Sequence, residues 1–196
     1  MKIRTNRQQQ ALETKNKLID AALRTFSRKG FGESTTKDIA QEAGVTDGLI
    51  YHYFKSKEDL LWAILDKYTL LHSMQEELGK MDSEAPLEQQ LTDYFRSLFR
   101  SLREQQDLIV MCFGEAGRNS EVRKRLEGII RQGVELLHAH LVPRLRTTSY
   151  DLMVAIRNIQ TAMVLYFLMT DRFSNDERER NRYIETTVRQ FMKAVK

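Results

Sequence analysis

The chain has 196 residues, of which 41% are hydrophobic and 30% are charged, a balance typical of a soluble globular protein. Only two prolines and nine glycines occur, and this composition favours long helices over strands. The single cysteine, Cys112, excludes an internal disulfide, so we expect a reducing, cytoplasmic compartment. The longest apolar run, Ala162 to Met169, is too short to span a bilayer, and we expect no membrane partner.

The positive charge of the chain is concentrated near its N-terminus. Residues 1–57 contain eleven Lys and Arg against six Asp and Glu, whereas the rest contains twenty against twenty-one. The first ten residues, MKIRTNRQQQ, are basic and polar, and they do not resemble a signal peptide. A basic segment attracts a polyanion whatever the total charge, here +4, so this part is the candidate for binding nucleic acid.

A first helix is predicted from about Arg7 or Leu12 to Lys29, with Gly30 ending it. Its apolar residues recur three and four positions apart, which places them on one face of a helix. They are Ile19, Ala22, Leu23 and Phe26.

The next stretch, residues 36–55, reads TKDIAQEAGVTDGLIYHYFK and predicts two short helices joined by a sharp turn. Gly44 stands at the turn, where the backbone often needs a positive φ. Thr35 and Thr46 are predicted N-caps of the two helices, and Asp38 completes a capping box with Thr35. An apolar stripe would pack the two helices together, and its members are Ile39, Ala40, Ala43, Val45 and Ile50. This pattern predicts a helix-turn-helix.

A fourth helix, capped by Ser56, is predicted to continue to about Leu78, and residues 79–86 are the best linker candidate. Five further helices are predicted, starting at Pro86, at about Gln106, at Asn119 or Ser120, at about Ser149, and at Ser174, which is expected to cap the last one. The expected fold is therefore all-α, with about nine helices.

The segments FSRKGF, TTKDIAQEAGV and LIYHYFKSKEDLL resemble the N-terminal domain of the TetR family of bacterial transcriptional regulators, over about Lys15 to Leu65. The resemblance implies a three-helix DNA-binding domain with a helix-turn-helix and a basic N-terminal arm, residues 1–56. It also implies a larger helical ligand-binding and dimerisation domain, residues 57–196, whose sequence carries no motif that we can place. The implied function is a homodimeric, ligand-responsive transcriptional repressor that binds double-stranded DNA.

By this resemblance the helix from Thr46 to Tyr53 enters the major groove. The positions that correspond to the family's base-reading residues are Asp47, Gly48, Leu49 and His52. Asp47 could accept a hydrogen bond from a cytosine amino group, His52 could meet a guanine acceptor or a phosphate, and Leu49 could touch a thymine methyl. Phosphates repel Asp47, so helix capping is an alternative role for it, while Gly48 would permit close approach of the backbone.

Phosphate contacts, which position the module without reading sequence, are expected from a second set of residues. These are Thr35, Thr36, Lys37, Thr46, Tyr51, Tyr53, Lys55 and Lys57. The arm that carries Lys2, Arg4 and Arg7 either adds backbone or minor-groove contacts or remains a solvated tail.

The predicted helix from about Ser149 to Phe173 is apolar on almost every face, so it must be covered on more than one side. Together with the last helix it looks like half of an intermolecular four-helix bundle. The expected interface residues are Ile156, Val164, Leu168, Ile184, Val188, Phe191 and Met192. A two-fold dimer would bind a roughly palindromic operator, with half-sites about one helical turn apart or a multiple of that. The alternative that one chain covers both faces by itself remains open.

A ligand pocket is expected between the predicted helices four to eight. Its candidate lining is aromatic or rich in sulfur, namely Trp62, Leu65, Tyr68, Phe95, Phe99, Met111, Cys112, Phe113, Met163 and Phe167. Such a lining favours a small hydrophobic ligand. This ligand would bind more tightly to the dimer when its two DNA-binding domains are spaced so that they cannot both bind the operator. The alternative is that most of these are ordinary core residues.

The sequence offers no convincing catalytic or metal site. Gly128 and Gly133 have P-loop-like spacing, but Val134 stands where a Lys is needed. His138 and His140 would point away from each other on a helix and cannot share a metal. We therefore expect no enzyme activity, no metal and no cofactor. The alternative to a ligand-responsive repressor is a DNA-bound structural or interaction protein resembling the family's nucleoid-occlusion members, whose C-terminal domain would bind a protein.

Overall fold

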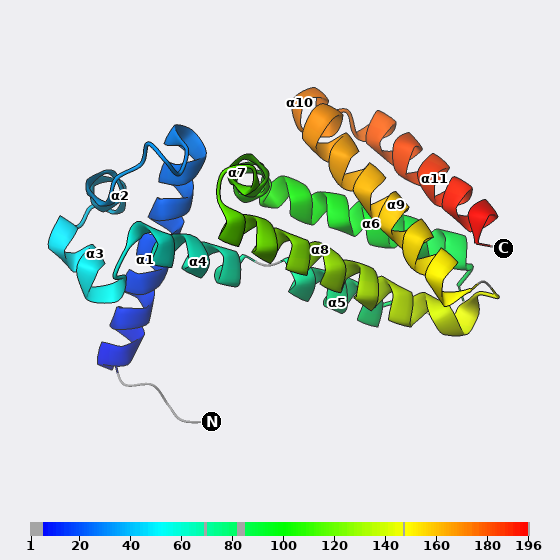
Figure 1. Cartoon of the computed structure of the whole chain (residues 1–196), viewed down its shortest axis with the longest axis horizontal. Helices are drawn as coiled ribbons and strands as arrows, with labels where there is room; N and C mark the ends of the chain where they lie inside the picture. Colours follow the sequence, from blue (N-terminus) through cyan, green and yellow to red (C-terminus); the bar gives the residue numbers. More distant parts are fainter. Residues whose placement is uncertain (1–5, 69, 82–84, 147, 196) are drawn as a thin grey trace. The chain divides into compact units, whose positions relative to one another are not determined.

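The structure is a computed structural model that describes residues 6–68, 70–81, 85–146 and 148–195. Every regular element in these ranges is helical, so the predicted all-α fold is confirmed (Figure 1). The helices are α1 (Asn6–Lys29), α2 (Thr36–Ala43), α3 (Asp47–Tyr53), α4 (Lys57–Lys67), α5 (Leu70–Gly79), α6 (Leu87–Glu104), α7 (Gln106–Ala116), α8 (Ser120–Leu141), α9 (Ser149–Tyr166), α10 (Arg172–Ser174) and α11 (Glu177–Ala194), with a 3-10 turn η1 (Val142–Arg144) and a π-helical turn η2 (Phe167–Asp171).

The chain divides into two compact units. The N-terminal unit comprises residues 1–69 together with 107–118, and the C-terminal unit comprises residues 70–106 and 119–196. In the N-terminal unit α1 packs against both α2 and α4, and α2 packs against α3. This unit therefore continues beyond residue 56, where we placed the boundary of the DNA-binding domain, because α4 buries its apolar face with α1. The functional boundary itself stays a prediction.

The predicted fourth helix is two helices in the structure. α4 ends at Lys67, and Tyr68 takes the position after its last turn with φ −111° and ψ 31°. α5 then begins at Leu70. Thr69, residues 82–84 of the predicted linker, and Lys2 and Arg4 of the predicted arm lie outside the described residues.

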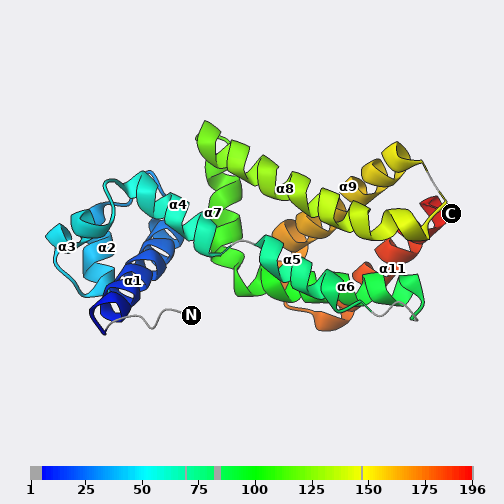
Figure 2. The same cartoon turned by 90° about the horizontal axis from the view of Figure 1, so that it is seen from below.

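In the C-terminal unit five helices form a closed ring around one core. Each helix packs against the next in the order α5, α6, α11, α9, α8 and back to α5. Figures 1 and 2 show α9 and α11 running alongside each other within this unit. The core inside the ring is apolar, and its fully buried members include Leu91, Phe95, Phe99, Leu137, Ile156, Met163, Phe167, Ile184 and Val188.

This ring buries part of the surface expected at the dimer interface, and the interface itself stays a prediction. Ile156 and the apolar stripe of α11 (Ile184, Val188, Phe191, Met192) are all buried within the chain itself. The reason is that α6 and α9 both pack against α11 and cover its apolar stripe. These five residues therefore contribute to the core of their own protomer and leave little surface for a partner.

A buried ion cluster lies after the C-terminal end of α9. The carboxylate of Asp171, in the π-helical turn, is fully buried. It accepts hydrogen bonds from Arg180 Nε at 2.7 Å and from Arg103 Nη1 at 2.9 Å. Arg103 also donates to the side chain of Asn175, whose backbone adopts the left-handed conformation with φ 49°. The cluster thus ties α6, the turn after α9 and α11 together.

The helical stretch from Tyr150 to Ser174 exposes a row of large apolar side chains. Leu165, Met169 and Phe173 are spaced by four residues and are 56%, 70% and 71% exposed. A π turn rotates by a smaller angle per residue than an α turn, so side chains four residues apart stay on one side of this stretch. By length and composition alone this 25-residue stretch could cross a membrane, although the shorter run of apolar residues predicted otherwise. An exposed apolar row of this kind is typical of a surface that binds another molecule.

Removing the buried carboxylate should be far more damaging than removing an exposed one. We expect Asp171→Ala to lower the free energy of unfolding by about 3–5 kcal/mol, because two arginines lose their buried partner. Glu185→Ala is the matched control: it removes the partner of Arg96 in an ion pair of 2.6 Å at the surface and should cost no more than about 1 kcal/mol. Urea unfolding followed by circular dichroism measures both changes. Equal effects of the two variants would contradict a structural role for the cluster.

Candidate DNA-binding site

The start of α2 is fixed by the predicted capping box. The backbone N–H of Asp38 donates to Thr35 Oγ1 at 3.1 Å, and the backbone N–H of Thr35 donates to Asp38 Oδ2 at 3.0 Å. Lys29 at the end of α1 adds an ion pair of 2.6 Å to the other oxygen of the same carboxylate. The box therefore both caps α2 and joins it to α1.

The turn between α2 and α3 uses the conformational freedom of Gly44. This residue has φ 63° and ψ 42°, a left-handed conformation that is strained for residues with a side chain. The N–H of Val45 donates to Ala40 O at 3.0 Å, which closes the end of α2. Thr46 occupies the N-cap position of α3, but its side chain makes no capping hydrogen bond, so that part of the prediction is wrong.

Three cations of α1 are used to hold α2. Glu42 pairs with Arg24 Nε at 2.8 Å and with Arg28 Nη2 at 3.0 Å, while Lys29 pairs with Asp38. Hydrogen bonds from Arg24 and Arg28 hold the pKa of Glu42 below its ordinary value. Three of the eleven Lys and Arg of residues 1–57 thus pair with two carboxylates of α2.

Lys57 also has a structural task that the sequence did not indicate. Its ammonium donates to the carbonyl oxygens of Phe31 at 2.6 Å, Gly32 at 3.2 Å and Ser34 at 2.9 Å. It lies 4.5 Å from the centroid of the Phe31 ring as well, a distance that allows a cation–π contact. Lys57 therefore holds the loop between α1 and α2, and a phosphate would have to compete with three carbonyls for it.

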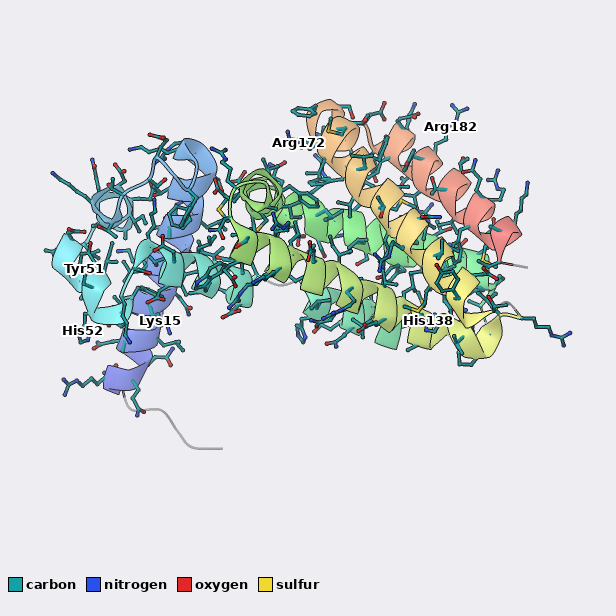
Figure 3. The ribbon with its side chains drawn as sticks, viewed as in Figure 1. Lys15, Tyr51, His52, His138, Arg172 and Arg182 are labelled. Carbon is teal, nitrogen blue, oxygen red and sulfur yellow. The ribbon has the colours of Figure 1, made fainter. Side chains whose placement is uncertain are left out.

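The exposed side of α3 carries the predicted reading residues. Only Ile50 of this helix is buried, whereas Asp47, Gly48 and His52 are exposed and Leu49 is half-buried. Figure 3 labels His52 and Tyr51 on α3 and Lys15 on α1, all within the N-terminal unit. One apolar residue thus anchors the helix and leaves the others accessible.

The predicted phosphate-binding residues surround this exposed side. Tyr51 is 55% exposed, and its hydroxyl lies 3.1 Å from Thr36 Oγ1, so a residue of α2 and one of α3 present adjacent hydroxyls. The ring of Tyr53 stands edge-on to His52 with centroids 5.0 Å apart. Lys37 and Lys55 are exposed and make no salt bridge among the described residues. Lys15 of α1, which the sequence did not single out, has its ammonium 5.7 Å from the ring centroid of Phe54, directly after α3.

The predicted pocket residues fall into two groups. Trp62, Leu65 and Tyr68 of α4 and Met111, Cys112 and Phe113 of α7 belong to the N-terminal unit, and Phe113 is exposed. Phe95, Phe99, Met163 and Phe167 are buried core residues of the C-terminal unit, where the rings of Phe99 and Phe167 pack edge to face. The hydroxyl of Tyr68 donates to the Asp20 carboxylate, which also receives Lys67. Tyr68 thus links the end of α4 to α1.

The described residues hold no group of three or more His, Cys, Asp or Glu side chains that could bind a metal ion. Cys112 is buried, and burial raises the pKa of its thiol to about 12. A thiol with such a pKa stays protonated and is a poor nucleophile.

Comparison with known proteins agrees with this geometry. Residues 18–64 match the model of a family described as "Bacterial regulatory proteins, tetR family". The HTH-type transcriptional repressor KstR2 of Mycolicibacterium smegmatis is 30% identical over 140 residues, which span 64% of this chain and 67% of KstR2. The uncharacterized HTH-type transcriptional regulator YerO of Bacillus subtilis is 29% identical over 119 residues, and the match spans 57% of this chain but only 40% of YerO.

The fold also matches solved structures over nearly the whole chain. The transcriptional regulator FadR from Bacillus subtilis in complex with stearoyl-CoA superimposes with a TM-score of 0.72. The two proteins are 22% identical, and the match covers 92% of this chain and 99% of FadR. At this identity the likeness establishes the fold.

The capping box should make stability depend on acid. The hydrogen bonds from Lys29 and Thr35 lower the pKa of Asp38 from 3.8 to about 2. A carboxylate whose folded pKa lies below its unfolded value stabilises the fold above the unfolded pKa, and this stabilisation is lost as the pH falls through the folded pKa. The difference in urea midpoint between the wild type and Asp38→Ala should therefore be constant near neutral pH and shrink between about pH 4 and about pH 2.

Lys29→Ala is the matched variant, because it removes the largest cause of the low pKa and should move this loss to higher pH. A midpoint difference between wild type and Asp38→Ala that stays the same down to pH 2 would contradict the linkage.

Proposed function

Because the chain belongs to the TetR family of bacterial regulatory proteins and is a helix-turn-helix transcriptional regulator, we propose that it acts as a homodimeric repressor of a roughly palindromic DNA site and is released by a small, mainly apolar effector. The observation that carries this proposal is the accessible side of α3, where one buried residue, Ile50, anchors a helix whose other side chains are free to meet DNA. The proposed DNA target places the protein in the cytoplasm.

In this proposal α3 enters the major groove and reads base edges through Leu49 and His52. Asp47 either accepts from a cytosine amino group or favours the start of α3 through its position in the first turn. Gly48, exposed and without a side chain, lets the backbone come close to the bases.

The surrounding hydroxyls and cations would hold the helix on the DNA backbone. The hydroxyls of Thr36 and Tyr51 lie 3.1 Å apart, so one donates to the other and the accepting hydroxyl keeps its own proton to donate to a phosphate oxygen. Lys37 and Lys55 supply positive charge that no described carboxylate neutralises. Thr35 and Lys57 are better regarded as supports of the site, because their polar atoms already bind within the protein.

Dimerisation is proposed through the exposed row on α9, η2 and α10. Val164 and Leu168, expected at the interface from the sequence, are half-buried on this stretch. Leu165, Met169 and Phe173 extend the surface and are more exposed than either. A second copy of the same row would bury these side chains by an isologous contact, in which each residue faces its own symmetry mate or a neighbour of it.

The effector is proposed to bind within the C-terminal unit. FadR of Bacillus subtilis, which shares this fold, has been solved in complex with stearoyl-CoA, a ligand with a long apolar chain. The core of this unit is likewise apolar, which favours an effector with a mainly apolar body. Release from DNA requires that the effector bind the DNA-incompetent state more tightly, and such coupling is typically ~1–3 kcal/mol.

The direct test of repression is a footprint of the protein on the DNA upstream of its own gene. We expect two protected half-sites with approximate two-fold symmetry, about one helical turn apart or a multiple of that. His52→Ala should weaken binding to this site by roughly tenfold or more, because a base contact is lost, and should change binding to unrelated DNA little. Lys37→Ala, a phosphate contact, should weaken both by a similar factor.

A protein that binds all DNA equally, or protects no symmetric site in any upstream region tested, would contradict the repressor proposal. Loss of specific and unspecific binding to the same degree in His52→Ala would assign His52 to the backbone instead of the bases.

The dimer is tested by placing a charge in the exposed row. Met169→Glu should shift the protein from dimer to monomer in sedimentation-velocity experiments, because two buried carboxylates would face each other. Val142→Glu is the control, since Val142 is an exposed apolar residue of η1 outside that row. A wild-type protein that sediments as a monomer at micromolar concentration, or a Met169→Glu protein that remains dimeric, would contradict this interface.

A further inference from the structure

The core of the C-terminal unit contains a polar group without a partner. Tyr94 of α6 is only 3% exposed, and its hydroxyl makes no hydrogen bond to any described residue. The side chain of Gln160 on α9 approaches this hydroxyl without the geometry of a hydrogen bond. A buried hydroxyl that has lost water and gained no partner destabilises the folded state, so its presence calls for a reason.

A second polar residue lies beside it. Gln160 is buried, and its amide donates to the backbone carbonyl of Gly133 on α8 at 3.1 Å. Gln160 is one of six polar or charged residues that are buried among the described residues, and the Tyr94 hydroxyl is a further polar group in the interior. Here they approach each other from α9 and α6, within a ring of helices whose core is mainly apolar.

Met74 of α5 fills the space next to these groups. A Cβ atom added to Gly133 would lie 2.9 Å from Met74 Cε and 3.8 Å from Gln160 Nε2. The end of the Met74 side chain therefore occupies the room that the missing side chain of residue 133 leaves open. Methionine has three rotatable side-chain bonds and no branch, so this end can move at little cost.

A small cavity adjoins the same side chains. It has a volume of about 10 Å³, enough for one water molecule, and Met74 and Tyr94 both line it. The remaining lining residues are Ser73, Glu77, Ser97, Leu98 and Ser101, and the surface that they present to it is mainly apolar. Moving the end of Met74 aside would extend this cavity, which Tyr94 also lines, toward the space at Gly133.

We propose that Met74 is a movable plug over the effector site, and that the effector is a small, uncharged molecule with an apolar body and one hydrogen-bond acceptor that receives the Tyr94 hydroxyl. The body replaces the end of Met74 against Gly133, and the acceptor gives Tyr94 its missing partner. This inference rests on the proposed function, because the occupant is the effector that releases the repressor.

Two electrostatic features define the ligand class. Burial raises the pKa of the Tyr94 hydroxyl well above its ordinary value, so the group stays protonated and serves as a donor to a carbonyl, ether or similar oxygen. Glu77 lines the cavity, and its pKa is lowered mainly by Lys80, 2.7 Å away. A carboxylate at this wall repels an anionic ligand.

The test uses the full-length protein without DNA and a matched pair of probes. Acetophenone carries a carbonyl acceptor on a small apolar body, and ethylbenzene has nearly the same shape without an acceptor. Binding of each to the wild type, Met74→Ala and Tyr94→Phe is measured by titration while methyl NMR signals of the methionines are followed.

Acetophenone should bind the wild type more tightly than ethylbenzene, and Tyr94→Phe should remove that preference, by roughly three- to tenfold. Met74→Ala should strengthen binding of both probes, because the plug no longer competes for the space. Tyr94→Phe should also unfold at the same or a higher temperature than the wild type, since it removes an unpartnered buried hydroxyl. That stability makes it the decisive variant should Met74→Ala fail to fold.

The proposal is overturned if neither probe binds the wild type or Met74→Ala, or if Tyr94→Phe leaves the acetophenone preference unchanged. Both results are independent of the footprint. If the protein binds acetophenone through Tyr94 but protects no operator, the ligand site stands and the repressor function is contradicted. If the footprint is normal but neither probe binds, the repressor function stands and the ligand site is contradicted.

Discussion

The reading helix depends on one buried contact. α3 has seven residues and α2 has eight, and helices this short have no independent stability in water. They are stable because Ile50 is buried together with the apolar side of α2. The turn between the two helices has a left-handed conformation at Gly44, which glycine adopts without strain. The position of every residue of α3 that is proposed to meet DNA follows from this contact, since this helix has no other buried side chain.

The pairing of individual cations around this contact says more about DNA binding than the net charge does. Arg24, Arg28 and Lys29 neutralise two carboxylates of α2. Lys57 is bound by three carbonyls of the loop before α2. These cations stabilise the scaffold of the site and have little left to offer a phosphate. The attraction for DNA is left to exposed lysines such as Lys37 and Lys55, and screening by salt acts most strongly on these.

The C-terminal unit combines an apolar core with two polar groups of opposite character. Asp171 is fully buried but satisfied by two arginines, so it holds three segments in a defined arrangement. Tyr94 is almost as buried but has no partner. A satisfied buried charge fixes structure, whereas an unsatisfied buried hydroxyl is a cost that a ligand can relieve. This contrast is the physical basis for placing the effector beside Tyr94 and not beside Asp171.

Much of the N-terminal unit could be predicted from the sequence. The caps at Thr35 and Ser56 and the turn at Gly44 depend on residues within a few positions of one another, and the structure confirms them. The last helix is an exception, because Asp176 and not Ser174 accepts the N–H groups of its first turn. Several polar side chains stand close together there, and sequence alone does not choose among them.

The sequence by itself determined the all-helical fold, the helix-turn-helix and the family, because these follow from local periodicity, caps and a single turn. Only the tertiary structure decided which apolar faces are covered. The apolar stripe on α11 and the exposed row on α9, η2 and α10 look alike in sequence. Yet α6 packs against the stripe, whereas no described segment covers Met169 or Phe173 in the row. Periodicity reports that a face is apolar, but the helix that covers it comes from far along the chain or from a second copy.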